Sequence, residues 1–178
     1  MSQPRITPLP RAEWGDGTRR ALSPLLPAER ANPDDAGALL STLLRHESLT
    51  QAYLHFNAHL LLNSTLSPRV REIAILRAAV HRDCEYLWDH HVPLARRAGL
   101  TDDEIAAVRA GGGVALGDLD LLVAAAADEL DLQNTLSDRT WTALSEQFDE
   151  RQRMDLVFTV GAYHLLALAV NAFGIDGD

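Results

Sequence analysis

The residues whose chemical types could support catalysis are concentrated in one stretch, which contains Glu72, the single cysteine Cys84 and His91. If a helix begins at Cys84, then Cys84 and His91 share one of its faces, because seven residues make about two helical turns. Leu87 and Trp88 then lie between them. In the first turn of a helix, free backbone N–H groups and the helix dipole favour a thiolate. We therefore expect Cys84 to be a candidate nucleophile.

Two carboxylates are expected to affect the chemistry of this cluster. Asp83 is the predicted N-cap of the same helix, where its negative charge would partly oppose thiolate formation. Glu72 shares a face of the preceding predicted helix with Leu76 and Ala79, and a carboxylate on an apolar face is partly buried. Burial raises its pKa and suits it to moving protons. The spacing thus predicts a catalytic set of Glu72, Cys84 and His91.

A structural interpretation of the same residues remains open. A lone cysteine is usually a small buried hydrophobe. A glutamate beside an apolar stripe is often ion-paired at the surface, here with Arg69 or Arg71. Trp88 is most simply a core residue.

Composition excludes several kinds of chemistry and partner. The chain has 178 residues and 16 basic side chains, all arginine, so Schiff-base lysines and a P-loop lysine are absent. The net charge of −9 disfavours nucleic acid and anionic membranes as partners. A single cysteine permits no internal disulfide and no CxxC pair. No uninterrupted apolar run reaches about 18 residues and no signal-like core begins the chain, so we expect a cytoplasmic protein.

The sequence does not indicate a cofactor. It has no glycine-rich phosphate loop and no Ser–His–Asp order. His55 and His59 are four residues apart, a spacing that can hold a metal on one helix face, but no further ligand completes the motif. We expect that pair to lie at a surface or interface, with no metal and no cofactor bound.

The hydrophobic pattern predicts an all-α protein, with helices near 35–46, 48–63, 67–81, 84–98, 101–110, 117–131, 137–147 and 150–173. Six of the eight prolines lie in the first 33 residues, so residues 1–34 are predicted to form a Pro-rich N-terminal arm before a helical domain at 35–178. Ser67 with Pro68, and Thr101 with Glu104, are typical helix starts. The last helix is apolar almost all round, as expected for a core or subunit-interface helix.

Three segments resemble a known family: LSPRVREIAILRAA, CEYLWDHHVPLARRAGLTDDEI and the closing LVFTVGAYHLLALAVNAFGI. They are similar to the carboxymuconolactone decarboxylase-like proteins, whose superfamily includes the alkylhydroperoxidase AhpD. The resemblance covers roughly residues 40–174. It implies an all-helical fold that assembles into a homotrimer or homohexamer, with the site near subunit contacts.

The alkylhydroperoxidase motif is a glutamate, a CxxC pair and a histidine four positions after the second cysteine. By this resemblance Glu72, Cys84 and His91 take the glutamate, first cysteine and histidine positions, whereas the second cysteine is replaced by Leu87. The second cysteine is the one that attacks peroxide. The resemblance therefore implies that a dithiol peroxidase cycle cannot run in this chain.

Three functions remain open. In the first, a cofactor-independent lyase or isomerase, Glu72 and His91 carry out acid–base chemistry on a small organic acid or lactone. Donors to a developing dienolate would come from Tyr86 and from Tyr163 or His164, and a cation for an anionic substrate from Arg77 or Arg82. In the second, Cys84 is the sole redox centre of a peroxidase restored by an external thiol. The third is a non-catalytic oligomer that binds a small ligand between Leu87, Trp88 and Tyr163.

Overall fold

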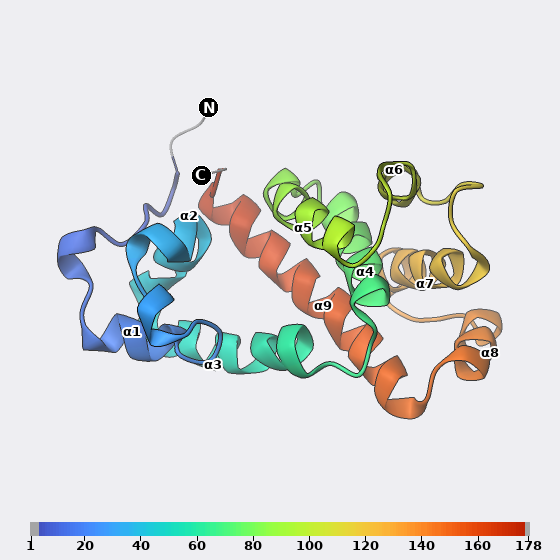
Figure 1. The fold of residues 1–178 in the computed structure, drawn as a ribbon, viewed down its shortest axis with the longest axis horizontal. Helices are drawn as coiled ribbons and strands as arrows, with labels where there is room; N and C mark the ends of the chain where they lie inside the picture. The colour runs from blue at the N-terminus through green and yellow to red at the C-terminus, as the bar shows by residue number, and fades with distance from the viewer. Residues whose placement is uncertain (1–3, 177–178) are drawn as a thin grey trace. The chain divides into compact units, whose positions relative to one another are not determined.

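A computed structural model describes residues 4–176, and within that range every regular element is helical. The all-α prediction is therefore confirmed. The α-helices, labelled in Figure 1, are α1 (Asp16–Leu22), α2 (Pro33–Leu43), α3 (Glu47–Ala58), α4 (Pro68–His81), α5 (Glu85–Arg97), α6 (Asp102–Ala110), α7 (Asp118–Gln133), α8 (Asp138–Gln147) and α9 (Glu150–Phe173).

The predicted capping residues begin and end these helices as expected. The Ser67 hydroxyl accepts a hydrogen bond from the Val70 N–H at the start of α4. Thr101 and Glu104 form a reciprocal capping box at the start of α6. That helix ends at Gly111, whose left-handed backbone (φ 86°) glycine adopts without steric cost.

Two predicted helices are interrupted. The helix expected over 35–46 ends at Leu43 and continues as a 3₁₀ turn, Leu44–His46. The helix expected over 48–63 ends at Ala58 and continues as a π-helix, His59–Asn63. Neither of these endings is signalled by a glycine or proline, so the hydrophobic period alone could not reveal them. Helix α2 is also kinked at Gly37, whose positive φ of 66° is not helical.

The described residues form two compact units, one running up to Asn63 and resuming at Ala169, the other spanning Ser64–Leu168. In the first unit, the proline-rich segment packs on the core of α2 and α3. Buried Leu22 and Leu54 lie at the centre of that cluster, with Trp14 packed against it. The early apolar residues therefore cover a core of their own chain.

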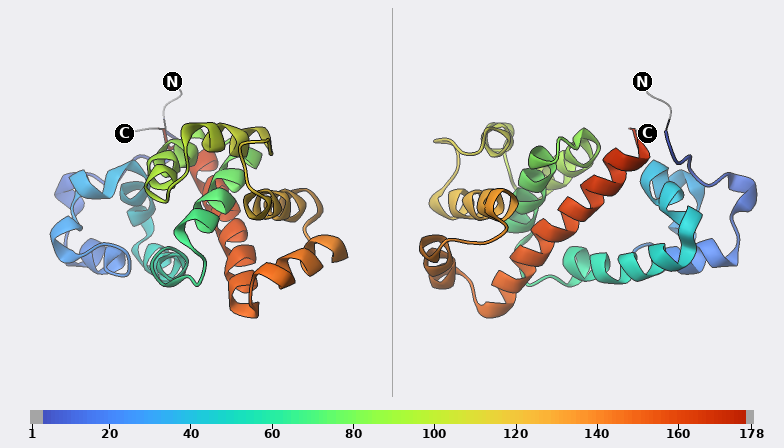
Figure 2. Two further views of the ribbon diagram at one scale, coloured as in Figure 1. Left: turned by 45° about the vertical axis from the view of Figure 1, so that its right-hand side comes forward. Right: turned by 180° about the vertical axis from the view of Figure 1, so that it is seen from behind.

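The second unit is organised around α4. This helix packs against α5, α6 and α7 (Figure 2), and its apolar side chains from Ile73 to Ala79 are almost completely buried. Two charged residues of α4 are buried with this apolar stretch: Glu72 is 2% exposed and Arg77 is 5% exposed.

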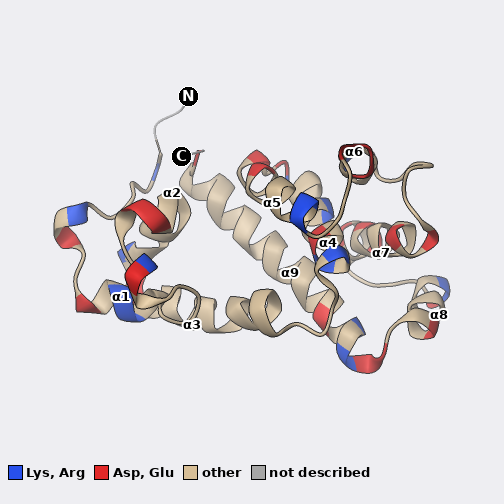
Figure 3. Cartoon of the chain, in the orientation of Figure 1, with Lys and Arg blue, Asp and Glu red and all other residues tan. Residues whose placement is uncertain are grey.

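The last helix, α9, buries Leu156, Val160 and Tyr163. Its charged residues lie in its first turns, and the remainder is uncharged (Figure 3). The sequence contains no uninterrupted apolar run of membrane-spanning length. By its length and composition, however, α9 is apolar enough to cross a membrane. Core helices of soluble proteins meet the same criterion, so this property does not place the chain in a membrane.

Candidate functional site

The candidate site is built around a hydrogen-bonded pair of side chains from α4 and α5. Nδ1 of His91 lies 2.8 Å from Oε2 of Glu72, and the two side chains are 9% and 3% exposed. Helices α4 and α5 are joined by a short turn, which folds them into a hairpin and brings Glu72 opposite His91. A buried pair of this kind can hold a proton between two groups that are shielded from bulk water.

Tyr163, from α9, completes the surroundings of His91. The two rings meet edge to face, with centroids 5.0 Å apart and planes at 89°. Tyr163 is itself 2% exposed. Its ring therefore restricts the orientation of the imidazole, and three helices contribute to the site.

Arg71 lies near the other carboxylate oxygen of Glu72. Its Nε atom lies 3.6 Å from Oε1 of Glu72, too far for a hydrogen bond. That nitrogen is buried and has no hydrogen-bond partner among the described residues, although the Arg71 side chain as a whole keeps 17% exposure. The carboxylate of Glu72 is thus flanked by an imidazole at one oxygen and a guanidinium at the other.

The structure corrects the prediction for Cys84. Helix α5 begins at Glu85, so Cys84 rather than Asp83 is its N-cap, and Asp83 adopts positive φ (47°) in the turn. Cys84 is 2% exposed, and this burial raises the pKa of its thiol. The Leu87 backbone N–H opposes the rise and the Glu85 charge adds to it. Burial therefore outweighs the helix terminus, and the thiolate is disfavoured.

Three other predicted site residues lie on α5 and are buried. The ring of Tyr86 stacks on His90 at 4.1 Å, and the ring of Trp88 is covered by the Arg109 guanidinium at 4.6 Å. Leu87 is 2% exposed. Of the predicted catalytic and substrate-binding side chains, the structure brings His91 into contact with both Glu72 and Tyr163.

The arginines considered for binding an anionic substrate are engaged by carboxylates of α7. Arg77 donates from Nε to Asp128 at 2.7 Å and from a terminal nitrogen to the Val108 carbonyl at 2.8 Å. Arg82 pairs with Asp131 at 2.5 Å. Both cations therefore tie helices together.

Two histidines also contact the aspartates that bind Arg77 and Arg82. This network of arginines, histidines and aspartates was not predicted from the sequence. His81 lies 2.7 Å from Asp128, and His164 lies 3.2 Å from Asp131. Burial lowers the pKa of His164, the Arg82 charge lowers it further, and Asp131 opposes them. The available signal was a pair of aspartates three residues apart on the alanine-rich helix α7.

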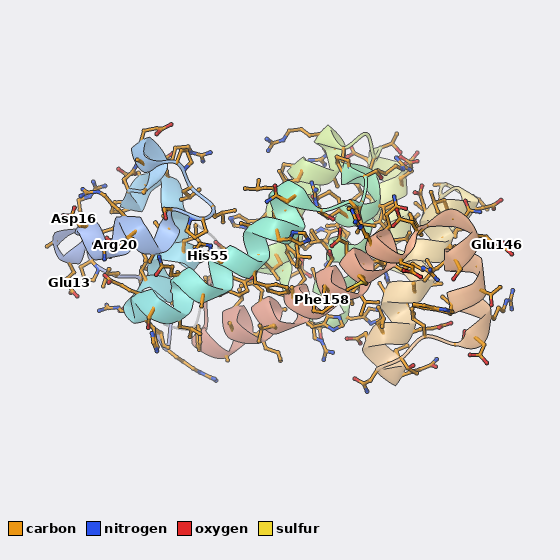
Figure 4. The ribbon with its side chains drawn as sticks, turned by 90° about the horizontal axis from the view of Figure 1, so that it is seen from below. Glu13, Asp16, Arg20, His55, Glu146 and Phe158 are labelled. Carbon is orange, nitrogen blue, oxygen red and sulfur yellow. The ribbon has the colours of Figure 1, made fainter. Side chains whose placement is uncertain are left out.

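Within residues 4–176, no group of three or more histidine, cysteine, aspartate or glutamate side chains is placed to hold a metal ion. His55, on the exposed face of α3, is labelled in Figure 4.

The chain is similar in sequence or in fold to several known proteins. Residues 47–129 match the model of the carboxymuconolactone decarboxylase family. A comparison with curated protein sequences finds no match. The family match covers a little less than half of the chain and agrees with the family resemblance found in the sequence.

Solved structures share the fold at low sequence identity. One is a protein of unknown function from Agrobacterium tumefaciens, suggested to be the antioxidant defence protein AhpD. It has a TM-score of 0.66 and 16% identity over 76% of this chain and 94% of its own. Another is the debrominase Bmp8, with a TM-score of 0.64 and 15% identity over 97% of this chain and 91% of its own. At such identities the likeness establishes the fold alone.

Proposed function

We propose that this protein is a cofactor-independent lyase or isomerase that carries out acid–base chemistry on a small organic acid or lactone. Glu72 and His91 move the proton. The observation that supports this proposal is their buried contact of 2.8 Å, which supplies an acid–base pair where water is excluded. The family includes decarboxylases, which is consistent with such a reaction.

The contact defines the role of each group. When Glu72 is ionised it accepts a hydrogen bond from the Nδ1–H of His91, and this leaves the lone pair of the neutral imidazole on Nε2. Nε2 is then the base that removes a proton from the substrate. Glu72 stabilises the imidazolium that forms. In an isomerisation the same proton returns to another carbon of the substrate. In a decarboxylation the carboxylate leaves as CO₂, and the imidazolium form of His91, protonated from solvent, donates its proton to the carbanion that remains.

The test is a screen of lactones and unsaturated acids, followed by substitution of the pair. We expect Glu72→Gln and His91→Gln to lower kcat by about 10²–10⁴-fold, the usual contribution of acid–base catalysis. Cys84→Ser is the matched control, since it alters a buried residue nearby and should keep kcat within a few-fold of wild type. Full activity in Glu72→Gln would overturn the proposal.

A single-cysteine peroxidase is the second candidate, favoured by the suggested antioxidant role of a protein with the same fold. The raised pKa of the Cys84 thiol argues against it, because peroxide reacts with the thiolate. Peroxide consumption that disappears in Cys84→Ser would establish the peroxidase instead. A protein in which none of these substitutions changes any turnover would be the non-catalytic ligand-binding oligomer.

We further propose that the chain is a cytoplasmic homo-oligomer, a trimer or hexamer. Helix α9 supports this, because one of its faces stays apolar and exposed in the single chain. Met154, Leu165 and Leu168 are 59%, 56% and 57% exposed, and Phe158, labelled in Figure 4, is 52% exposed. Exposed apolar stripes of this kind usually mark an interface. Light scattering at micromolar concentration that gives a monomer mass would refute the proposal.

A further inference from the structure

Arg71 is a mostly buried cation whose hydrogen-bonding capacity the described residues leave unused. Its side chain is 17% exposed, and its Nε is buried without a hydrogen-bond partner. It forms an ion pair with Glu72, at 3.6 Å. A guanidinium has five N–H donors, and buried donors are nearly always paired. Within residues 4–176, the Arg71 guanidinium thus keeps a buried N–H donor unpaired next to Glu72, the partner of His91.

Other arginines of the same unit show how this chain arranges a structural ion pair. Arg69 approaches Asp120 to 2.6 Å, and Arg77 approaches Asp128 to 2.7 Å. Both are hydrogen-bonded contacts of the length expected for charge-assisted pairs. The Arg71–Glu72 separation of 3.6 Å is distinctly longer. The contact with Glu72 therefore supplies Arg71 with a neighbouring charge but not with a hydrogen bond.

We infer that Arg71 binds the carboxylate of the substrate. A guanidinium presents two parallel N–H donors that match the two oxygens of a carboxylate. A carboxylate held on Arg71 would lie next to Glu72, whose other oxygen contacts His91. The rest of the substrate would then extend beside the groups that move the proton.

This inference rests on the proposed function and narrows its substrate class. It selects small organic acids, which carry a carboxylate at neutral pH, over uncharged lactones. It also replaces Arg77 and Arg82, which are engaged by Asp128 and Asp131, as the source of the cation. Arg71 is a binding residue and takes no part in proton transfer.

The experiment measures binding rather than turnover. Benzoate and benzamide have nearly the same shape and differ in charge, so a titration of each at pH 7, by calorimetry or ligand-observed NMR, isolates the carboxylate. We expect wild type to bind benzoate at least about tenfold more tightly than benzamide, the lower end for a hydrogen bond to a charged group. Arg71→Met should lose that preference, and Arg71→Lys should keep part of it.

Two further variants make the result specific. Arg96→Met removes an exposed arginine that pairs with Asp102, and it should bind benzoate as wild type does. Glu72→Gln removes the negative charge beside Arg71, and it should bind benzoate more tightly. If Arg71 had only a structural role, Arg71→Met and Glu72→Gln would not change the affinity for benzoate in opposite directions. The inference is overturned if Arg71→Met retains the preference, or if wild type shows none.

The two proposals fail in distinguishable ways. If benzoate binding depends on Arg71 but Glu72→Gln keeps full turnover, the carboxylate site stands and the acid–base proposal falls. If Glu72→Gln loses turnover while Arg71→Met binds benzoate normally, the acid–base proposal stands and the carboxylate site falls. If Arg71→Met fails to fold, the Arg71→Lys and Glu72→Gln titrations still decide the matter.

Discussion

His91 and Glu72 form a hydrogen bond of 2.8 Å between side chains that are 9% and 3% exposed. Because both side chains are largely shielded from water, removal of one leaves the other short of a hydrogen-bond partner. The contact therefore has consequences for stability that are separate from any effect on turnover.

We expect His91→Ala to lower the free energy of unfolding by about 2–4 kcal/mol, because it leaves the Glu72 carboxylate buried without its partner. His91→Asn should cost less, since its side-chain amide can donate from near the position of Nδ1. Urea denaturation monitored by circular dichroism measures both. Equal losses for the two variants would show that the hydrogen bond contributes little.

The Cys84 thiol should react slowly at neutral pH, because burial raises its pKa and limits access. The measurement is the rate of alkylation by iodoacetamide between pH 6 and pH 10, followed by mass spectrometry. We expect a rate at pH 7 at least about tenfold below that of a free cysteine, rising toward the alkaline end. A rapid reaction with a midpoint below about pH 8 would instead support the peroxidase.

Arg69 should be important for stability, since it binds Glu104 of α6 and Asp120 of α7 at 2.5 and 2.6 Å. Arg69→Met leaves Asp120, 9% exposed at its side chain, without this partner. We expect a loss of about 2–4 kcal/mol in the free energy of unfolding. Arg96→Met breaks an exposed pair and should cost under about 1 kcal/mol. Similar losses in the two variants would contradict this assignment.

Mild acid should destabilise the protein through His164. The folded-state pKa of His164 is lowered, chiefly by burial, whereas the unfolded chain titrates near the ordinary value of about 6.5. The unfolded state therefore binds the proton more readily. The contribution of His164 is fully present above about pH 6.5 and is lost as pH falls through its folded-state pKa. His164→Gln should reduce the difference in unfolding free energy between pH 7 and pH 5. If His164→Gln leaves the difference in unfolding free energy between pH 7 and pH 5 unchanged, His164 is not the cause of the acid destabilisation.

The helices were largely predictable because local residues specify them. Ser67 with Pro68 and Thr101 with Glu104 mark two helix starts, and the structure places both as expected. The turn before α5 was predicted less well. Asp83 is a favourable N-cap by residue type, but it adopts positive φ, which aspartate tolerates better than most residues, and Cys84 takes the cap position.

The candidate site was predictable only in part. The spacing of Glu72 and His91 identified a pair that the structure brings into contact. Arg71 was considered only as a surface ion-pair partner of Glu72, because no sequence pattern reveals that a guanidinium is buried and short of acceptors. The roles of Arg77 and Asp128 depend on the packing of α4 against α7, which is a long-range contact outside any local motif.

The hairpin of α4 and α5 also has a consequence for the order of folding. Glu72 and His91 are 19 positions apart in the chain, and contacts this local form early because little chain entropy opposes them. Tyr163 belongs to the last helix, so it leaves the ribosome after both. We therefore expect the Glu72–His91 pair to assemble during synthesis, before the aromatic ring of Tyr163 that packs on His91 is available.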